Sequence, residues 1–130
     1  YLMMRTAMVE SQLTHLRQLP NGPALGLMQL EPETIYSIYR YLERRTDIRD
    51  RLLDYLQMQA LPTYMDSFVS NLSLNAAFAR IKYWMSPEPI PPHSNIVAQG
   101  EYWKSHYNTI HGKGTVDAFT KHAVNLGEFA

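Results

Sequence analysis

The chain has 130 residues, and its 12 basic and 12 acidic side chains leave a formal net charge of zero. This balance argues against a nucleic-acid partner and against a role at a membrane surface, and no apolar run reaches the roughly 18 residues of a membrane span. Because cysteine is absent, disulfides, thiolate metal ligands and a thiol nucleophile are excluded. At this length we expect a single domain, residues 1–130.

The first third of the chain is predicted to form two helices separated by an irregular loop. Apolar residues recur at three- and four-residue spacings over residues 1–13, which favours a largely buried helix. Two prolines and two glycines then forbid regular helix between about residues 14 and 26. Pro32 followed by Glu33 begins the second helix, which runs to Arg45, because proline is tolerated in a first turn and an acidic side chain is favourable there.

The rest of the chain also has helical spacing. Thr46 with Asp47 predicts the N-cap of a third helix, and Pro62 ends or restarts that helix. Residues 61–72 and 73–85 are expected to form two more helices, and four prolines make residues 86–95 an extended loop. The last part reads as a helix, a break at residues 112–114 and a further helix capped by Thr115. The expected fold class is all-α, with six or seven helices and one irregular loop after the first.

Glu10 is the first candidate catalytic residue. Its neighbours Ala7, Met8, Val9 and Leu13 form an apolar band, and a carboxyl group at the rim of such a band has a raised pKa because desolvation disfavours the charged form. A glutamic acid that keeps its proton near neutral pH can donate it to a leaving oxygen. Gln29, after the loop, supplies a hydrogen-bond donor and an acceptor. The alternative is that Glu10 is an ordinary solvated residue on a helix surface.

Four segments, taken in order, resemble the lytic transglycosylases of the lysozyme superfamily. They are Glu10-Ser11, the run GLMQ at residues 26–29 with Pro32 and Thr34 opening the next helix, NLSLNAAFARIKYWM at residues 71–85, and HYNTIHGKGTV at residues 106–116. The resemblance spans roughly residues 4 to 120 and is greatest to the small lysozyme-like proteins of tailed bacteriophages and prophages. It implies a lysozyme-like helical domain of the goose-type and lytic transglycosylase kind.

The resemblance also implies roles for individual residues. Glu10 matches the single catalytic acid and base, and Ser11 matches the residue that steadies it. Gln29 matches the cleft glutamine that contacts the N-acetyl sugar, and Met28 matches a residue that lines the same floor of the cleft. Tyr107 and Asn108 match the pair that lies near the catalytic carboxylate and the acetamido group of the sugar.

The chain departs from the family pattern at several positions. Ser105-His106 replaces two alanines, Thr109 replaces another alanine, and Asn75 lies near the place of an expected glycine. These departures concern the sugar subsites more than the catalytic glutamate.

The expected substrate is the glycan strand of bacterial peptidoglycan, cleaved at the cell wall by a protein encoded by a phage or prophage. Hydrolysing glycosidases generally use two carboxylates, but no acidic residue lies between Glu10 and Gln29. We therefore expect a lytic transglycosylase that forms a 1,6-anhydro-muramyl product with Glu10 alone. The alternatives are a muramidase in which Glu31 is the second carboxylate, and an inactive virion component with the same fold.

No cofactor is expected, and no metal site, because the five histidines do not have the spacing of a helical metal motif. His15 and Arg17, in the loop, are candidates for binding a muramyl carboxylate, or are simply solvated. Tyr83 and Trp103 are aromatic residues that could border a sugar subsite, although aromatic spacing in this chain is mostly that of core residues.

Overall fold

The computed structural model describes residues 1–18, 21–109 and 112–125 of the chain. Within these ranges there are seven α-helices and one π-helix, and no strand is present apart from isolated bridges in the loop after the first helix. The all-α class expected from the sequence is confirmed. In chain order the elements are α1 (Leu2–Ser11), α2 (Pro32–Arg44), α3 (Thr46–Leu56), α4 (Ser67–Ser70), α5 (Leu72–Trp84), α6 (Ile96–Trp103), η1 (Lys104–Asn108) and α7 (Val116–Asn125).

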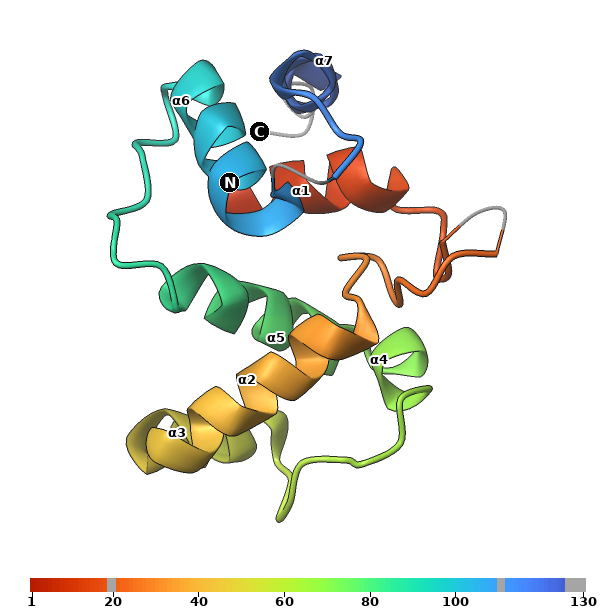
Figure 1. The fold of residues 1–130 in the computed structure, drawn as a ribbon, viewed down its shortest axis with the longest axis vertical. Coiled ribbons are helices and arrows are strands. Elements are labelled where there is room, and N and C mark those ends of the chain that lie inside the picture. Colours follow the sequence, from red (N-terminus) through yellow and green to blue (C-terminus); the bar gives the residue numbers. More distant parts are fainter. Residues whose placement is uncertain (19–20, 110–111, 126–130) are drawn as a thin grey trace.

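Helix α5 runs through the middle of the molecule, and other elements pack on both of its sides (Figure 1). α1 and η1 contact it from one side, and α6 and α7 pack against these two. α2, α3 and α4 contact it from the other side. Side chains of α5 can therefore interact with residues from both halves of the molecule.

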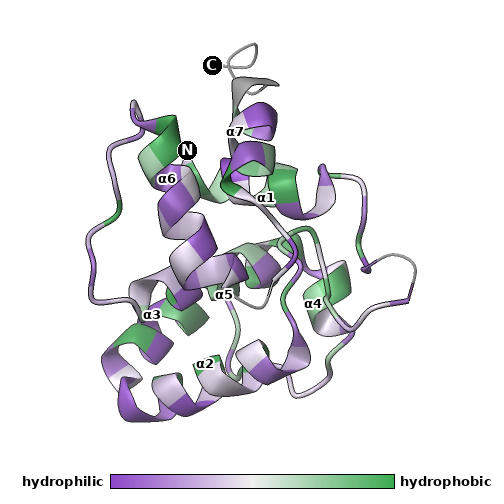
Figure 2. Ribbon diagram, turned by 45° about the horizontal axis from the view of Figure 1, so that its top comes forward, coloured by the Kyte–Doolittle hydropathy of each residue, from purple (hydrophilic) through white to green (hydrophobic). Residues whose placement is uncertain are grey.

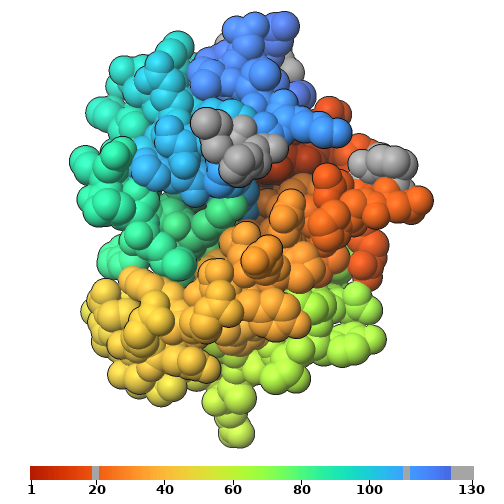
Figure 3. All heavy atoms as spheres, in the orientation of Figure 1, coloured from red at the N-terminus to blue at the C-terminus, as the bar shows by residue number. Residues whose placement is uncertain are grey.

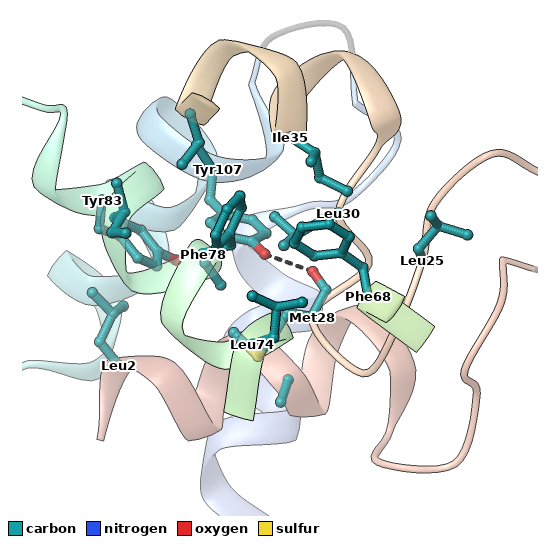
Figure 4. Close-up of a cluster of buried hydrophobic side chains, with 14 of the residues drawn as sticks. Leu2, Leu25, Met28, Leu30, Ile35, Phe68, Leu74, Phe78, Tyr83 and Tyr107 are labelled. Atoms are coloured by element: carbon teal, nitrogen blue, oxygen red, sulfur yellow. Dashed lines mark hydrogen bonds between the residues drawn. The ribbon is translucent and has the colours of Figure 1, made fainter. Parts of the chain in front are cut away.

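The core is built from the apolar faces of these helices. α2 buries Ile35, Ile38 and Leu42 at spacings of three and four residues, while much of its remaining surface is hydrophilic (Figure 2). Phe68 of α4 and Phe78 of α5 pack edge to face, with ring centroids 4.7 Å apart. Figure 4 shows a cluster of these buried side chains. Burying one such side chain stabilises a fold by roughly 1.5–3 kcal/mol.

The first helix is shorter than predicted. It ends at Ser11 rather than at residue 13, because Gln12 and Leu13 have left-handed backbone angles with φ of 54° and 58°. The N–H of Gln12 still donates to Met8 O at 3.0 Å, so the chain leaves the helix in a tight turn. Glu10 consequently lies in the last turn of α1.

The predicted N-cap of the third helix is wrong. A single residue, Arg45, separates α2 from α3, so Thr46 is already helical and no side chain caps the start of α3. The carboxylate of Asp47 instead accepts hydrogen bonds from the Arg45 guanidinium at 3.1 Å. The junction is too short to give Thr46 the extended backbone that an N-cap residue needs.

The helix predicted over residues 61–72 is also mostly wrong, because this stretch contains only the short α4 before α5 begins at Leu72. The hydroxyl of Tyr39 donates to the Pro62 carbonyl, which holds this part of the chain against α2 in a non-helical path. Asn71 then caps the next helix, since its side chain accepts a hydrogen bond from Leu74 N at 3.0 Å. Tertiary contacts thus override local helical propensity here.

The C-terminal part agrees with the predicted loop over residues 86–95 and with Thr115 as a cap, because Thr115 Oγ1 accepts from Ala118 N at 3.1 Å. The preceding helix begins at Ile96, directly after the loop, with Asn95 as its cap. It continues directly into η1, a π-helical turn that the sequence did not indicate. Such turns are rare and occur frequently at functional sites.

Candidate active site

The segment 25–30 forms a tight hairpin-like loop at the centre of the candidate site. Leu25 and Leu30 exchange backbone hydrogen bonds of 2.8 Å and 3.0 Å. Gly26 has φ of 75°, and a Cβ there would overlap the Asn75 side chain and the Phe68 carbonyl, so glycine is required by both conformation and space. Gln29 has φ of 50°, an uncommon value for a residue with a side chain, and such backbone strain clusters at functional sites.

Asn75 of α5 holds this loop in place. Its Oδ1 accepts a hydrogen bond from Met28 N at 2.9 Å, and its Nδ2 donates to Leu25 O at 3.1 Å. From the other side, the Tyr107 hydroxyl donates to Met28 O at 2.6 Å, as the dashed line in Figure 4 shows. The loop is therefore clamped between α5 and η1.

Glu10 reaches this region from the last turn of α1. Its Oε1 accepts a hydrogen bond of 3.0 Å from Nε1 of Trp103, a buried residue at the end of α6. Burial raises the pKa of Glu10 to about 7, against the opposing effects of the Trp103 N–H and the positive charge of Lys82, while the negative charge of Glu31 raises this pKa further. The partial negative charge at the C-terminal end of α1 acts in the same direction as burial.

The Glu10 side chain lines a cleft of about 780 Å³. The cleft is bordered by α1, by the loop leading to α2, by α5 and by the segment from α6 to α7; its lining includes Gln29, Glu31, Tyr107 and Asn108. A second hollow of about 620 Å³ adjoins it and shares Glu31, Thr34 and Lys82. Figure 3 shows that the orange segments of the first third of the chain and the blue segments of its last third meet on one face of the molecule. The two hollows together suit an elongated ligand.

Two residues predicted for this site lie elsewhere. Ser11 was expected to steady Glu10, but its buried hydroxyl donates to Ala7 O at 3.1 Å and accepts from Leu13 N at 3.2 Å. It therefore closes the end of α1, and Trp103 is the residue that holds the Glu10 carboxyl group. Met28 was expected on the cleft floor, but its side chain belongs to the buried core (Figure 4). Met28 is connected to the site through its backbone carbonyl, which accepts the hydrogen bond from Tyr107.

The other predicted residues border the cleft in different ways. Gln29 is half-buried, and its Nε2 donates to Gly26 O at 2.9 Å, which orients the amide over its own loop. Tyr107 is buried, and its hydroxyl is already committed to Met28. Asn108 Oδ1 accepts a hydrogen bond of 2.7 Å from Lys104 Nζ. Glu31 is exposed at the start of α2, in both hollows.

His15 also lines the cleft, whereas Arg17 forms an exposed ion pair of 2.5 Å with Asp66. Tyr83 is buried, and its hydroxyl hydrogen-bonds with that of Thr6 at 2.7 Å, so it does not border the cleft. Within the described ranges, no three acidic or histidine side chains come together as a metal site. None of the helices in the described ranges is long and apolar enough to cross a membrane.

Sequence reasoning missed three residues of the site. Asn75 was noted only as a departure from a family pattern, Lys82 was not singled out, and Trp103 was considered as a subsite border rather than as a partner of Glu10. For Asn75 the sequence did contain a signal. This polar residue interrupts the apolar face of α5, which includes Leu74 and Phe78, and a polar residue on an inner helix face is informative.

Comparisons of the chain with protein-family models, with curated proteins and with solved structures found no match.

Proposed function

We propose that this chain cleaves the glycan strands of bacterial peptidoglycan as a lytic transglycosylase, with Glu10 as the single acid and base. The observation that carries the proposal is the Glu10 carboxyl group, whose pKa burial raises to about 7 inside a cleft that also contains Gln29 and Asn108. Both the protonated and the ionised form of Glu10 are therefore accessible near neutral pH. A group poised in this way can act first as an acid and then as a base.

In the first step, Glu10 gives its proton to the oxygen that joins N-acetylmuramic acid to N-acetylglucosamine. The bond from that oxygen to C1 of the muramic sugar breaks, and the bonding electrons stay on the oxygen. A cationic sugar and the Glu10 carboxylate result. The hydrogen bond from Trp103 Nε1 to Glu10 Oε1 supports this step, because it stabilises the carboxylate as it forms.

In the second step, the Glu10 carboxylate takes the proton from the 6-hydroxyl of the muramic sugar. The oxygen of that hydroxyl bonds to C1, which closes the 1,6-anhydro ring and returns Glu10 to its protonated form. No water is consumed, so a second carboxylate that activates water is not needed. The half-buried amide of Gln29 and the side chain of Asn108 are the polar groups of the cleft that suit the acetamido group of a sugar.

Hydrolysis by a muramidase is the second candidate, and one observation favours it. Glu31 lines the cleft, and its charge is close enough to raise the pKa of Glu10. An exposed carboxylate in that position could orient a water molecule toward C1. An inactive virion component of the same fold is the remaining alternative.

The test measures the clearing of purified bacterial cell walls by the chain and by Glu10→Gln. Glu10→Gln keeps the size of the side chain and removes the proton donor, so we expect clearing to slow by at least ~100-fold. Glu43→Gln, an exposed position on α2 outside both hollows, is the matched control and should clear walls normally. Equal clearing by wild type and Glu10→Gln, or none by either, would overturn the proposal.

Mass spectrometry of the released fragments separates the two enzymatic candidates. A transglycosylase leaves muramic ends lighter by one water molecule than the reducing ends left by a muramidase. We expect the anhydro ends. Reducing ends, together with loss of activity in Glu31→Gln, would instead identify a muramidase.

A further inference from the structure

Lys82 of α5 lies where the two hollows join, and its side chain lines both. Its Nζ donates a hydrogen bond of 2.5 Å to the Tyr107 carbonyl and lies 3.9 Å from the centroid of the Tyr107 ring. The ammonium group is therefore held in one place by the backbone of η1 and by the aromatic face below it. The proposed reaction mechanism assigns it no role.

Two carboxylates from different elements line the main cleft together with this ammonium group. Glu10 comes from α1 and Glu31 from the start of α2, and both attract the charge of Lys82. Burial lowers the pKa of Lys82 to about 8, so the side chain still carries its charge at pH 7. The charge acts in turn on Glu10, since it opposes the rise in the Glu10 pKa that burial causes.

Other titratable groups border the same two hollows. The main cleft also contains His15 from the first loop, Lys113 from the segment before α7 and His122 from α7. The second hollow contains Glu33 and His106. The negatively charged forms of Tyr83 and Tyr107 are disfavoured by burial, which raises the pKa of both hydroxyls well above the working range.

We propose that Lys82 is a positioning residue for Glu10: its fixed positive charge allows the Glu10 side chain to release a proton at its position in the cleft and to take one back. This inference rests on the proposed function. Lys82 itself exchanges no proton with the substrate. When Glu10 protonates the glycosidic oxygen, a carboxylate forms at a largely buried position, and the ammonium group of Lys82 in the same cleft attracts it.

Removing the positive charge of Lys82 should change the pKa of Glu10 in one direction only. Without Lys82 the carboxylate form of Glu10 is less stable, so the pKa of Glu10 rises above its present value of about 7. The first step needs protonated Glu10, so the pH at which cleavage declines should rise together with this pKa. The maximal rate should fall at the same time, because protonating the sugar oxygen now leaves an uncompensated charge.

The test follows the titration of the Glu10 carboxyl carbon by NMR in wild type, Lys82→Met and Lys82→Arg, alongside the pH profile of wall clearing. In Lys82→Met we expect the Glu10 midpoint to rise by about one pH unit, the declining limb to move by the same amount, and the maximal rate to fall about tenfold. Lys82→Arg keeps the charge and should retain the wild-type midpoint. Lys113→Met removes a different cation from the same cleft and should leave the Glu10 midpoint unchanged.

Lys82→Gln guards against loss of the fold, because its amide can still donate a hydrogen bond to the Tyr107 carbonyl while carrying no charge. If Lys82→Met fails to fold, the raised midpoint is expected in Lys82→Gln. A merely structural role for Lys82 would lower the rate without moving the midpoint or the limb, and that result overturns the inference. A raised midpoint in a chain that clears no walls would support the charge coupling and overturn the proposed function, so the two failures are distinguishable.

Discussion

Glu10 is both ionisable and largely buried, and burial opposes ionisation in a folded protein. Its carboxyl group is held away from water and receives a hydrogen bond from Trp103. Burial of an ionisable group in this way favours the neutral form and makes the charged form unfavourable for folding. A residue with this environment lowers stability at neutral pH, which is typical of side chains kept for chemistry rather than for packing.

We expect Glu10→Gln to stabilise the fold in a pH-dependent way. The pKa of Glu10 is about 7 in the folded chain against 4.5 for an unperturbed carboxyl group. Below pH 4.5 both states hold the proton and the substitution has no effect of this kind. Between 4.5 and 7 the unfolded chain loses the proton first, so wild-type stability falls as pH rises, and above 7 the full loss of about 3 kcal/mol is reached.

Urea denaturation at pH 4 and pH 8 measures this difference. Glu10→Gln should match wild type at the lower pH and exceed it by about 3 kcal/mol at the higher one. Glu43→Gln, an exposed glutamate, should stay within about 0.5 kcal/mol of wild type at both. A difference that does not change with pH would contradict the burial of a proton-holding Glu10.

At the scale of elements, the loop 25–30 depends on groups that come from other elements. The loop has two left-handed residues, Gly26 and Gln29, and such a conformation persists only where the surroundings hold it. Asn75 satisfies the Met28 N–H and the Leu25 carbonyl, and Tyr107 satisfies the Met28 carbonyl. The position of Gln29 in the cleft is therefore set by α5 and η1.

We expect Asn75→Ala to destabilise the protein by about 2–3 kcal/mol, because it leaves the buried Met28 N–H without a partner and removes one of the two hydrogen bonds that the Leu25 carbonyl accepts. Hydrogen exchange at the Met28 amide should also become faster than in wild type. Asn71→Ala is the matched control: it removes one capping bond at the start of the same helix and should cost about 1 kcal/mol. If both variants leave exchange at Met28 unchanged, Asn75 does not hold the loop.

On the scale of the whole molecule, the cleft exists only because distant segments meet around α5. The hydrogen bond from Trp103 to Glu10 joins residues 93 positions apart. Arg5 makes a similar connection on the other side of α1, where its Nη1 donates to His93 O at 2.8 Å and to Gln99 Oε1 at 2.7 Å. Arg5 thereby ties α1 to the proline-rich segment 86–95 and to α6.

We expect Arg5→Met to lower stability by about 2 kcal/mol, because Oε1 of the buried Gln99 loses its partner and the His93 carbonyl loses a partly buried hydrogen bond. The loss is moderated because the Nε of Arg5 is itself buried without a hydrogen-bond partner in the part of the chain that is described. Arg80→Met, which removes a guanidinium stacked over Trp84, should cost at most about 1 kcal/mol. Chemical denaturation of both variants distinguishes the two roles, and equal stability of both would exclude a connecting role for Arg5.

Local signals account for the parts of the fold that the sequence predicted correctly. Pro32 and Glu33 begin α2, the apolar spacing of residues 73–85 matches α5, and the prolines of segment 86–95 prevent helix. Each of these signals acts over a few residues, so reading the chain in order is enough to detect it. The raised pKa of Glu10 could also be anticipated, because its apolar neighbours on α1 are close in sequence.

The sequence by itself determined the helical class, the irregular loop after the first helix and the carboxyl group around which a site could form. Only the tertiary structure decided that Trp103 rather than Ser11 holds this group, that Met28 faces the core, and that Asn75 and Lys82 of α5 serve the cleft. The physical reason is the range of the interactions. Helix propensity acts between neighbours, whereas the partner of a buried polar group is chosen by packing between elements that lie tens of residues apart.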